Sequence, residues 1–127
     1  AVARALEAIT GSAGAIVVVR SNAGTRLNFM SAVKEVQTRL HLRVKVVCVS
    51  DDVATSKRYG SRADFTQARG IAGSLLICKI AGAAAAAELS LDEVYEETAA
   101  AAAAVRTQGV SFHSCSIPGM LPARPIP

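Results

Sequence analysis

The chain has few aromatic side chains and no tryptophan. Of its 127 residues only two are Tyr and three are Phe, whereas hydrophobic residues make up 51% of the sequence. A core must therefore be built from aliphatic side chains and alanine. The shortage also argues against a nucleic-acid partner, because single-stranded nucleic acids stack on aromatic side chains within a basic groove. The net charge is +4, but the basic residues are scattered without a dense run, as on solvated helix faces.

Cysteine and histidine are too few and too widely spaced for a metal centre or a disulfide framework. Cys48, Cys78 and Cys115 include no C-x-x-C pair, so we expect small buried thiols in a reducing, cytoplasmic environment. His41 lies in an expected helix–strand turn and should be exposed. His113 lies two residues before Cys115. A Cys–His pair can form a nucleophile, but no third, orienting group is evident and two such residues share a strand face anyway. We therefore assign no catalytic residue and no metal ligand.

Long hydrophobic runs are scarce as well. Residues 70–87 carry one charge, Lys79, and are long enough to suggest a membrane span. Both flanks lack aromatic anchors, and the many glycines and alanines make the stretch only weakly apolar. We expect elements buried within an α/β layer and no membrane partner. The first residues also lack the basic start and apolar centre of a signal peptide.

The sequence does contain a strand–turn–helix pattern at residues 15–40. Five consecutive apolar residues at 15–19, four of them β-branched, predict a strand buried on both faces. Ser-Asn-Ala-Gly then predicts a turn, and Thr25 is expected to cap the following helix. The apolar positions that should pack this helix on a sheet are Phe29, Val33, Val36 and Leu40. Open α/β folds bind ligands where parallel strands end, so residues 20–25 are the first candidate for a site.

The same alternation of elements continues along the chain. A short helix is predicted at residues 2–9 and a second strand at 44–49, which would complete a βαβ unit. Asp51 and Asp52 close this strand. They could cap a helix, form a turn, hold a cation or bind a substrate hydroxyl. The pattern indicates an α/β fold with a parallel or mixed sheet and helices on both faces.

A final helix is predicted after Ser90. Ser90 and Glu93 have the spacing of a capping box, and the run of alanines that follows has high helix propensity. We expect this helix to end at Gly109. Alternation at residues 110–114 then predicts a further strand.

The candidate loop and several later segments resemble one known family. Residues 19–25 read Val-Arg-Ser-Asn-Ala-Gly-Thr, followed by Asn-Phe at residues 28–29. They resemble the substrate loop of dihydroxyacetone (glycerone) kinases, which reads Val-Lys-Asn-Tyr-Thr-Gly-Asp, two variable residues and Asn-Phe. Other segments resemble the family in the same order: Asp51-Asp52-Val53-Ala54, Arg69-Gly70-Ile71-Ala72-Gly73, Lys79-Ile80-Ala81-Gly82-Ala83-Ala84-Ala85, Gly109-Val110-Ser111 and Ser114-Cys115-Ser116-Ile117-Pro118-Gly119. We expect residues 5–119 to be a truncated or divergent part of a DhaK-type substrate-binding domain, and residues 120–127 to be a proline-rich tail.

This resemblance implies candidate substrate-binding residues. In the family, a lysine and an aspartate of the loop bind the substrate hydroxyls, the aspartate assists proton removal, and a downstream histidine traps the substrate carbonyl. Here the lysine position is Arg20 and the aspartate position is Thr25. A threonine hydroxyl can bind a substrate, but it cannot act as a carboxylate base near neutral pH. Arg20 and Thr25 are therefore candidate substrate-binding residues, and we expect no catalytic residue.

The resemblance also implies partners. The family takes its phosphoryl group from ATP–Mg²⁺ held by a helical domain or subunit, or from a phosphorylated partner subunit, so we expect no cofactor in this chain. One hypothesis is a domain that binds a dihydroxyacetone-like molecule and is inactive in isolation. The other is a non-catalytic, degenerate scaffold or partner-binding module. Because a short parallel sheet leaves its edges open, we also expect a homodimer.

Overall fold

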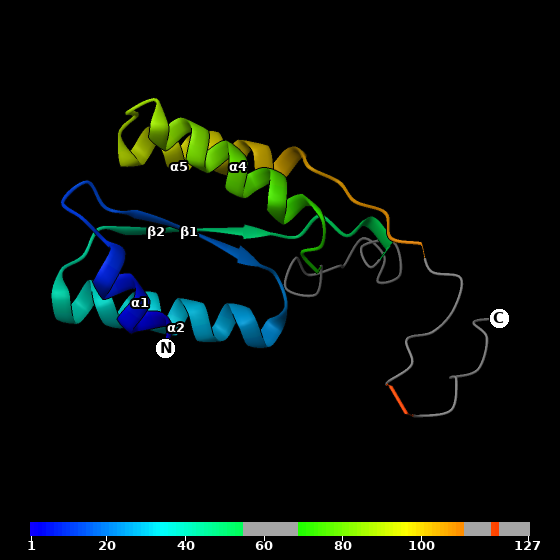
Figure 1. Ribbon diagram of the computed structural model, residues 1–127, viewed down its shortest axis with the longest axis horizontal. Coiled ribbons are helices and arrows are strands. Elements are labelled where there is room, and N and C mark those ends of the chain that lie inside the picture. Colours follow the sequence, from blue (N-terminus) through cyan, green and yellow to red (C-terminus); the bar gives the residue numbers. More distant parts are fainter. Residues whose placement is uncertain (55–68, 111–117, 120–127) are drawn as a thin grey trace.

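The computed structural model describes residues 1–54, 69–110 and 118–119. Its helices and strands are α1 (Val2–Ile9), β1 (Ala15–Arg20), α2 (Ala23–Leu40), β2 (Val44–Val49), α4 (Gly73–Ala86) and α5 (Leu91–Ala104). The strands form a central layer, with α1 and α2 on one face and α4 and α5 on the other (Figure 1). This is the α/β arrangement that the sequence predicts. In the described part of the chain, no helix is long and apolar enough to cross a membrane.

The sheet of the described residues consists of β1 and β2, which pair in parallel. Ala15 lies opposite Val44 and Arg20 lies opposite Val49, so both strands end at the same edge of the sheet. Helix α2 joins them and completes the predicted βαβ unit. Side chains alternate between the two faces of a strand, and this alternation divides the core into two clusters.

The two clusters are aliphatic, as the composition predicts. The cluster between the sheet and helices α1 and α2 contains the buried residues Leu6, Val17, Val19, Val33, Val36 and Val44, with Phe29 and Leu40 packed against them. The predicted inward face of α2 is thereby confirmed. Facing α4 and α5, the buried residues are Val47, Val49 and Ile77, with Ile16 and Val18 packed against them.

The amino end of α2 differs from the expectation. Its N-cap is Asn22, whose backbone is extended (φ −153°, ψ 159°), and Thr25 lies inside the first turn. The side-chain oxygen Oδ1 of Asn22 accepts the backbone N–H of Thr25 at 2.8 Å. Asparagine is at least as good an N-cap as threonine, and an N-cap at residue 22 in place of residue 25 starts the helix three residues earlier.

The end of α5 also differs from the expectation, whereas its start is as predicted. The capping box of Ser90 and Glu93 is present, but the helix ends at Ala104 and not at Gly109. The chain then turns extended because Thr107 pairs with the segment after β2. Its backbone N–H donates to the Asp51 carbonyl at 2.7 Å, and its carbonyl accepts the Val53 N–H at 3.0 Å. This pairing offers the backbone hydrogen bonds that a longer helix would have made.

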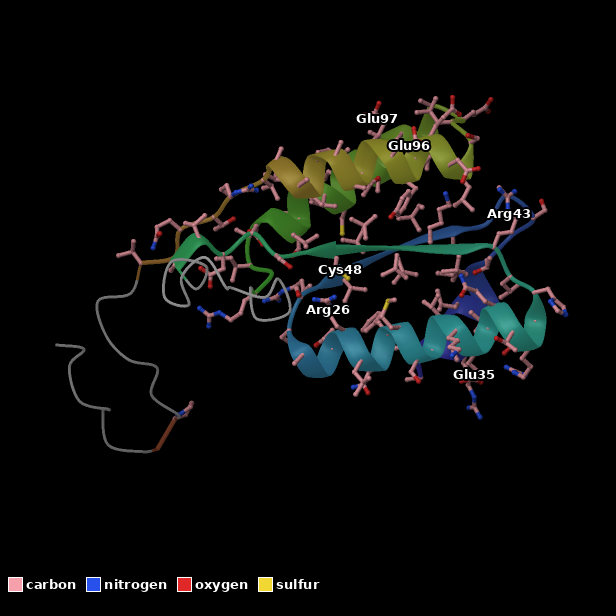
Figure 2. All side chains as sticks on the ribbon, turned by 180° about the vertical axis from the view of Figure 1, so that it is seen from behind. Arg26, Glu35, Arg43, Cys48, Glu96 and Glu97 are labelled. Carbon is pink, nitrogen blue, oxygen red and sulfur yellow. The ribbon has the colours of Figure 1, made fainter. Side chains whose placement is uncertain are left out.

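Other expectations at single residues have mixed outcomes. Cys48 is half-buried on the α2 face of the sheet (Figure 2), but Cys78 is exposed, so its expected burial is wrong. Cys78 directly follows Ile77, which is one of the buried residues of α4. His41 is exposed, as expected, and ends α2 in a left-handed conformation (φ 52°). His113, Cys115, most of the strand expected at residues 110–114 and the tail at 120–127 lie outside the described residues.

Candidate functional site

The candidate loop lies at the carboxyl edge of the sheet. β1 ends at Arg20 and α2 begins at Ala23, so Ser21 and Asn22 alone connect them. Figure 1 shows the amino ends of α2 and α4 at this edge, beyond the tips of both strands. Arg20 is exposed and Thr25 is half-buried. Both candidate substrate-binding residues therefore lie where open α/β folds bind ligands.

This loop has a positive electrostatic character. The first turn of α2 contains no acidic residue, and the amino end of a helix carries a partial positive charge. Arg26 lies at the same end of α2 (Figure 2). Among the described residues, Arg20 forms no ion pair with a carboxylate; its Nε donates to the carbonyl oxygen of Gly70 at 3.2 Å. The loop can thus offer donors to the oxygens of a ligand, but it offers no carboxylate base.

Gly70 fills the space directly beneath the loop. It is buried, and its N–H donates to the carbonyl oxygen of Ser21 at 2.9 Å. A Cβ at residue 70 would lie 2.5 Å from the carbonyl oxygen of Val49 and 2.9 Å from the amide nitrogen of Ser21. Because real Cβ atoms do not approach backbone atoms so closely, this position requires glycine.

Asp51 joins three segments at the same edge. Its side chain is 1% exposed. Oδ1 accepts the Ile71 N–H at 2.8 Å, and Oδ2 accepts both the Gly73 N–H at 2.7 Å and the hydroxyl of Thr107. Burial raises the pKa of Asp51, but the hydrogen bonds from Thr107, Ile71 and Gly73 outweigh it, so the pKa lies below the ordinary value of 3.8. Of the roles that the sequence left open, this ionised carboxylate serves as the cap of α4.

Asp52 has a separate set of partners. It is 2% exposed, and its Oδ1 accepts the Ala54 N–H at 2.9 Å, as in an Asx turn. Its Oδ2 accepts Nε and Nη2 of Arg69 at 3.0 and 2.9 Å. Both aspartates thus already accept protein donors. Within the described ranges, no group of three or more His, Cys, Asp or Glu residues could hold a metal ion.

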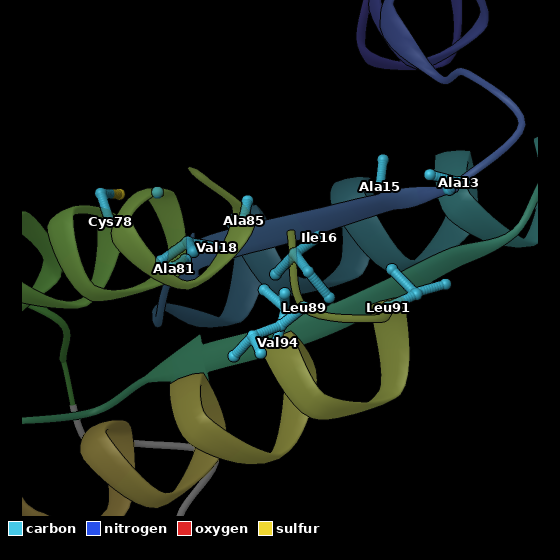
Figure 3. A pocket seen from close by; sticks show the side chains of 12 residues that line it. Ala13, Ala15, Ile16, Val18, Cys78, Ala81, Ala85, Leu89, Leu91 and Val94 are labelled. Atoms are coloured by element: carbon cyan, nitrogen blue, oxygen red, sulfur yellow. The ribbon is translucent and has the colours of Figure 1, made fainter. Parts of the chain in front are cut away.

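A cavity lies toward the other end of β1, between the sheet and helices α4 and α5 (Figure 3). Its volume is about 500 Å³, and its lining residues are Ala13, Gly14, Ala15, Ile16, Val18, Cys78, Ala81, Gly82, Ala85, Leu89, Leu91 and Val94. Apart from the thiol of Cys78, these side chains are apolar. Such a lining lacks the polar groups that orient a small polyhydroxylated ligand, so the carboxyl edge is the better candidate site.

Comparison with known proteins identifies the family. Residues 1–124 match the family model of the Dak1 domain. The chain belongs to the Dak1 domain family. The expected relationship to dihydroxyacetone kinases is thereby confirmed, and the α/β fold agrees with theirs.

The relatives of this Dak1-family chain are much longer proteins. It is 37% identical over 125 residues to dihydroxyacetone kinase of Citrobacter freundii, covering 98% of this chain and 21% of that protein. It is 36% identical over 114 residues to human triokinase/FMN cyclase, covering 88% and 18%. Crystal structures of the C. freundii kinase align with TM-scores of 0.80 for the native form and 0.83 for the complex with AMP-PNP and Mg²⁺, at 36% and 35% identity. The two structural alignments cover 98% and 99% of this chain and 22% of each kinase chain. This chain therefore spans about a fifth of its relatives' length.

Two residues of the candidate site are not marked as site residues by the sequence. Gly70 and Thr107 hold the loop and Asp51, yet they lie 50 and 56 residues away from those partners along the chain. One signal was available for Gly70: it belongs to a glycine-rich segment, and glycines allow backbone amides to approach a carboxylate or another strand closely. No local pattern marks Thr107, because an isolated threonine after a helix is ordinary.

Proposed function

We propose that this Dak1-family chain is the substrate-binding part of a kinase for small polyhydroxy ketones such as dihydroxyacetone, and that residues 20–25 hold the ligand. The observation that carries the proposal is the position of this loop, at the carboxyl edge of a parallel sheet beside the amino end of α2. The names of the relatives support the substrate class. They include kinases of dihydroxyacetone, of D-erythrulose and, putatively, of 3,4-dihydroxy-2-butanone, which are all short hydroxyketones.

Arg20 and Thr25 have complementary roles in this proposal. The guanidinium of Arg20 donates hydrogen bonds to a ligand oxygen, while its Nε remains on the carbonyl of Gly70. The hydroxyl of Thr25, which has no protein partner among the described residues, both donates to and accepts from a ligand hydroxyl. Neither group removes a proton near neutral pH. The isolated chain therefore binds substrate without transferring a phosphoryl group.

The nucleotide and its Mg²⁺ belong to a different domain or subunit in this proposal. A relative has been crystallised with AMP-PNP and Mg²⁺, but both described acidic side chains at the sheet edge, Asp51 and Asp52, already accept hydrogen bonds from the protein. We place the chain in the cytoplasm because Cys48 and Cys78 are free thiols, which reducing compartments favour. We further propose that it forms a homodimer.

Ligand titration tests the proposal. In ¹⁵N–¹H NMR spectra, dihydroxyacetone should shift the amide signals of residues 20–25 and leave the cavity-lining amides of α4 unchanged. Thr25→Val should weaken binding roughly tenfold by removing a ligand hydrogen bond. Thr38→Val is the matched control, because Thr38 is exposed further along α2. Incubation with dihydroxyacetone and ATP–Mg²⁺ should give no phosphorylated product.

Restoring the family residues provides the complementary test. The double variant Arg20→Lys with Thr25→Asp should bind dihydroxyacetone more tightly than the parent chain, because a carboxylate accepts stronger hydrogen bonds from substrate hydroxyls. If neither the parent nor this variant responds to the ligand, the loop is not a substrate site. That result would favour a non-catalytic scaffold or partner-binding module.

A further inference from the structure

We propose that Asp51 is the positioning residue of the ligand loop, and that it acts on Arg20 through the backbone of residues 70–73. The inference rests on the proposed function for the identity of the ligand. The chain of contacts that transmits the position is independent of any ligand. It connects the buried carboxylate to the exposed guanidinium in two steps.

The first step fixes residues 70–73 to the end of β2. The two carboxylate oxygens of Asp51 accept the amides of Ile71 and Gly73 at 2.8 and 2.7 Å. These amides belong to the amino end of α4, where a negative charge is favoured. A Cβ at Gly73 would lie 2.7 Å from Oδ2, so glycine permits this close approach. The carboxylate therefore determines where the segment before α4 lies relative to the sheet.

The second step transmits this position to the loop. Gly70 precedes the held amide of Ile71, and it contacts the loop through both of its backbone polar groups. Its N–H donates to the Ser21 carbonyl at 2.9 Å, and its carbonyl accepts Arg20 Nε at 3.2 Å. Gly70 lies so close to the backbone of Val49, Ser21 and Arg20 that an added Cβ would clash with them. A shift of residue 71 therefore moves the oxygen that orients Arg20.

Thr107 sets the orientation of the carboxylate itself. Its hydroxyl donates to Oδ2 of Asp51, and its backbone N–H donates to the Asp51 carbonyl at 2.7 Å. The segment after α5 thus holds Asp51 from the side opposite to the loop. Both carboxylate oxygens of Asp51 accept hydrogen bonds from protein donors. Asp51 consequently acts through the residues it holds, and it is not a proton acceptor for the ligand.

Two substitutions test the proposal in the intact chain. Asp51→Asn keeps the shape but places an NH₂ group against backbone N–H donors, and Thr107→Val removes only one donor. Both should move the Nε–Hε signal of Arg20 in ¹⁵N–¹H NMR spectra and accelerate hydrogen exchange of the Gly70 amide, by roughly tenfold for Thr107→Val. Both should weaken dihydroxyacetone binding. Thr107→Ser, which restores the hydroxyl, should return all three readouts to parental values.

A matched control separates positioning from a general loss of stability. Thr98 is fully buried, and its hydroxyl donates within α5 to the Val94 carbonyl at 2.6 Å. Thr98→Val should lower stability without altering the Arg20 and Gly70 signals. The proposal is overturned if Asp51→Asn and Thr107→Val leave those two signals unchanged, or if Thr98→Val changes them equally. If the parent chain binds no dihydroxyacetone, the proposed function fails, and the two NMR signals still decide whether Asp51 positions the loop.

Discussion

At the scale of single residues, two glycines with opposite surroundings show what the site requires. A Cβ at Gly70 would meet backbone atoms of Val49 and Ser21 within 3 Å, whereas a Cβ at Gly82 in α4 would meet nothing within 4 Å. Gly70→Ala should therefore destabilise the chain by about 1–3 kcal/mol, because backbone must move to admit the methyl group. Gly82→Ala should stabilise it by about 0.5–1 kcal/mol, because alanine favours the helical backbone.

Denaturant unfolding followed by circular dichroism measures both changes. Only Gly70→Ala should also perturb the amide signals of Arg20 and Ser21, since Gly82 lies in α4 away from the loop. Equal stability for the two variants, or a normal loop spectrum in Gly70→Ala, would show that residue 70 does not hold the loop.

The limits of sequence reasoning are also clearest at this scale. The position of Arg20 and Thr25 at the sheet edge follows from the order of strand, turn and helix. These elements are consecutive in the sequence, so the local pattern is enough to place both residues. The donors to Asp51 are 20, 22 and 56 residues away. No periodicity connects such residues, so their meeting depends on how α4 and the segment after α5 return to β2. The cap of α2 differs from the prediction for another reason, because Asn22 and Thr25 are both competent caps.

At the scale of an element, helix α4 is capped by Asp51, which follows β2 in the sequence, and this arrangement should make the stability of α4 depend on pH. The cap residue next to the helix, Ala72, supplies no side-chain hydrogen bond, and Asp51 accepts the amides of Ile71 and Gly73 instead. Because the pKa of Asp51 is lowered in the fold from its ordinary 3.8, its contribution to stability is complete above that pH. It is lost as the pH falls through the folded-state pKa and the carboxylate is protonated.

Unfolding at about pH 6 and about pH 3 tests this expectation. The parent chain should lose stability at the lower pH, and Asp51→Asn should lose distinctly less. The exposed carboxylates Asp92 and Glu93 also have lowered pKa values, through hydrogen bonds from Lys45 and Ser90. Added salt weakens the exposed Asp92–Lys45 ion pair, whereas the buried contacts of Asp51 should persist. An identical acid response of parent and variant at high salt would contradict the capping role.

Most of the helices and strands follow from the sequence, and the unexpected end of α5 has a physical cause. Both strands and the capping box of α5 follow from local patterns that tertiary packing reinforces. The end of α5 does not, because alanine and arginine favour continuation of the helix. Pairing of Thr107 with residues 51–53 competes with that local preference. A tertiary contact of this kind ends a helix where no sequence signal is present.

At the scale of the whole molecule, the described sheet leaves β1 unpaired on the side away from β2, and apolar surface flanks that edge. In a parallel pair, alternate residues of β1 direct their N–H and C=O groups away from β2, and the cavity lined by Ile16 and Val18 opens beside them. Leu75 is 65% exposed and shares a helix face with the cavity-lining Cys78 and Gly82 by its spacing. Exposed strand edges with apolar flanks promote association, so we expect the chain to pair with a second copy here.

Size-exclusion chromatography with light scattering over a range of concentrations should show a monomer–dimer equilibrium. Leu75→Lys should shift it toward the monomer by roughly tenfold or more in Kd, because a charge would have to be buried in the contact. Leu27→Lys is the matched control, since Leu27 is 72% exposed on α2, in the layer on the other face of the sheet. A parent chain that stays monomeric at every concentration, or an equal effect of both substitutions, would exclude association through this edge. A dimer that depends on Leu75 alone would place the contact at the first turn of α4, which begins at the same end of the strands as the loop, so the dimer contact and the ligand loop would be neighbours.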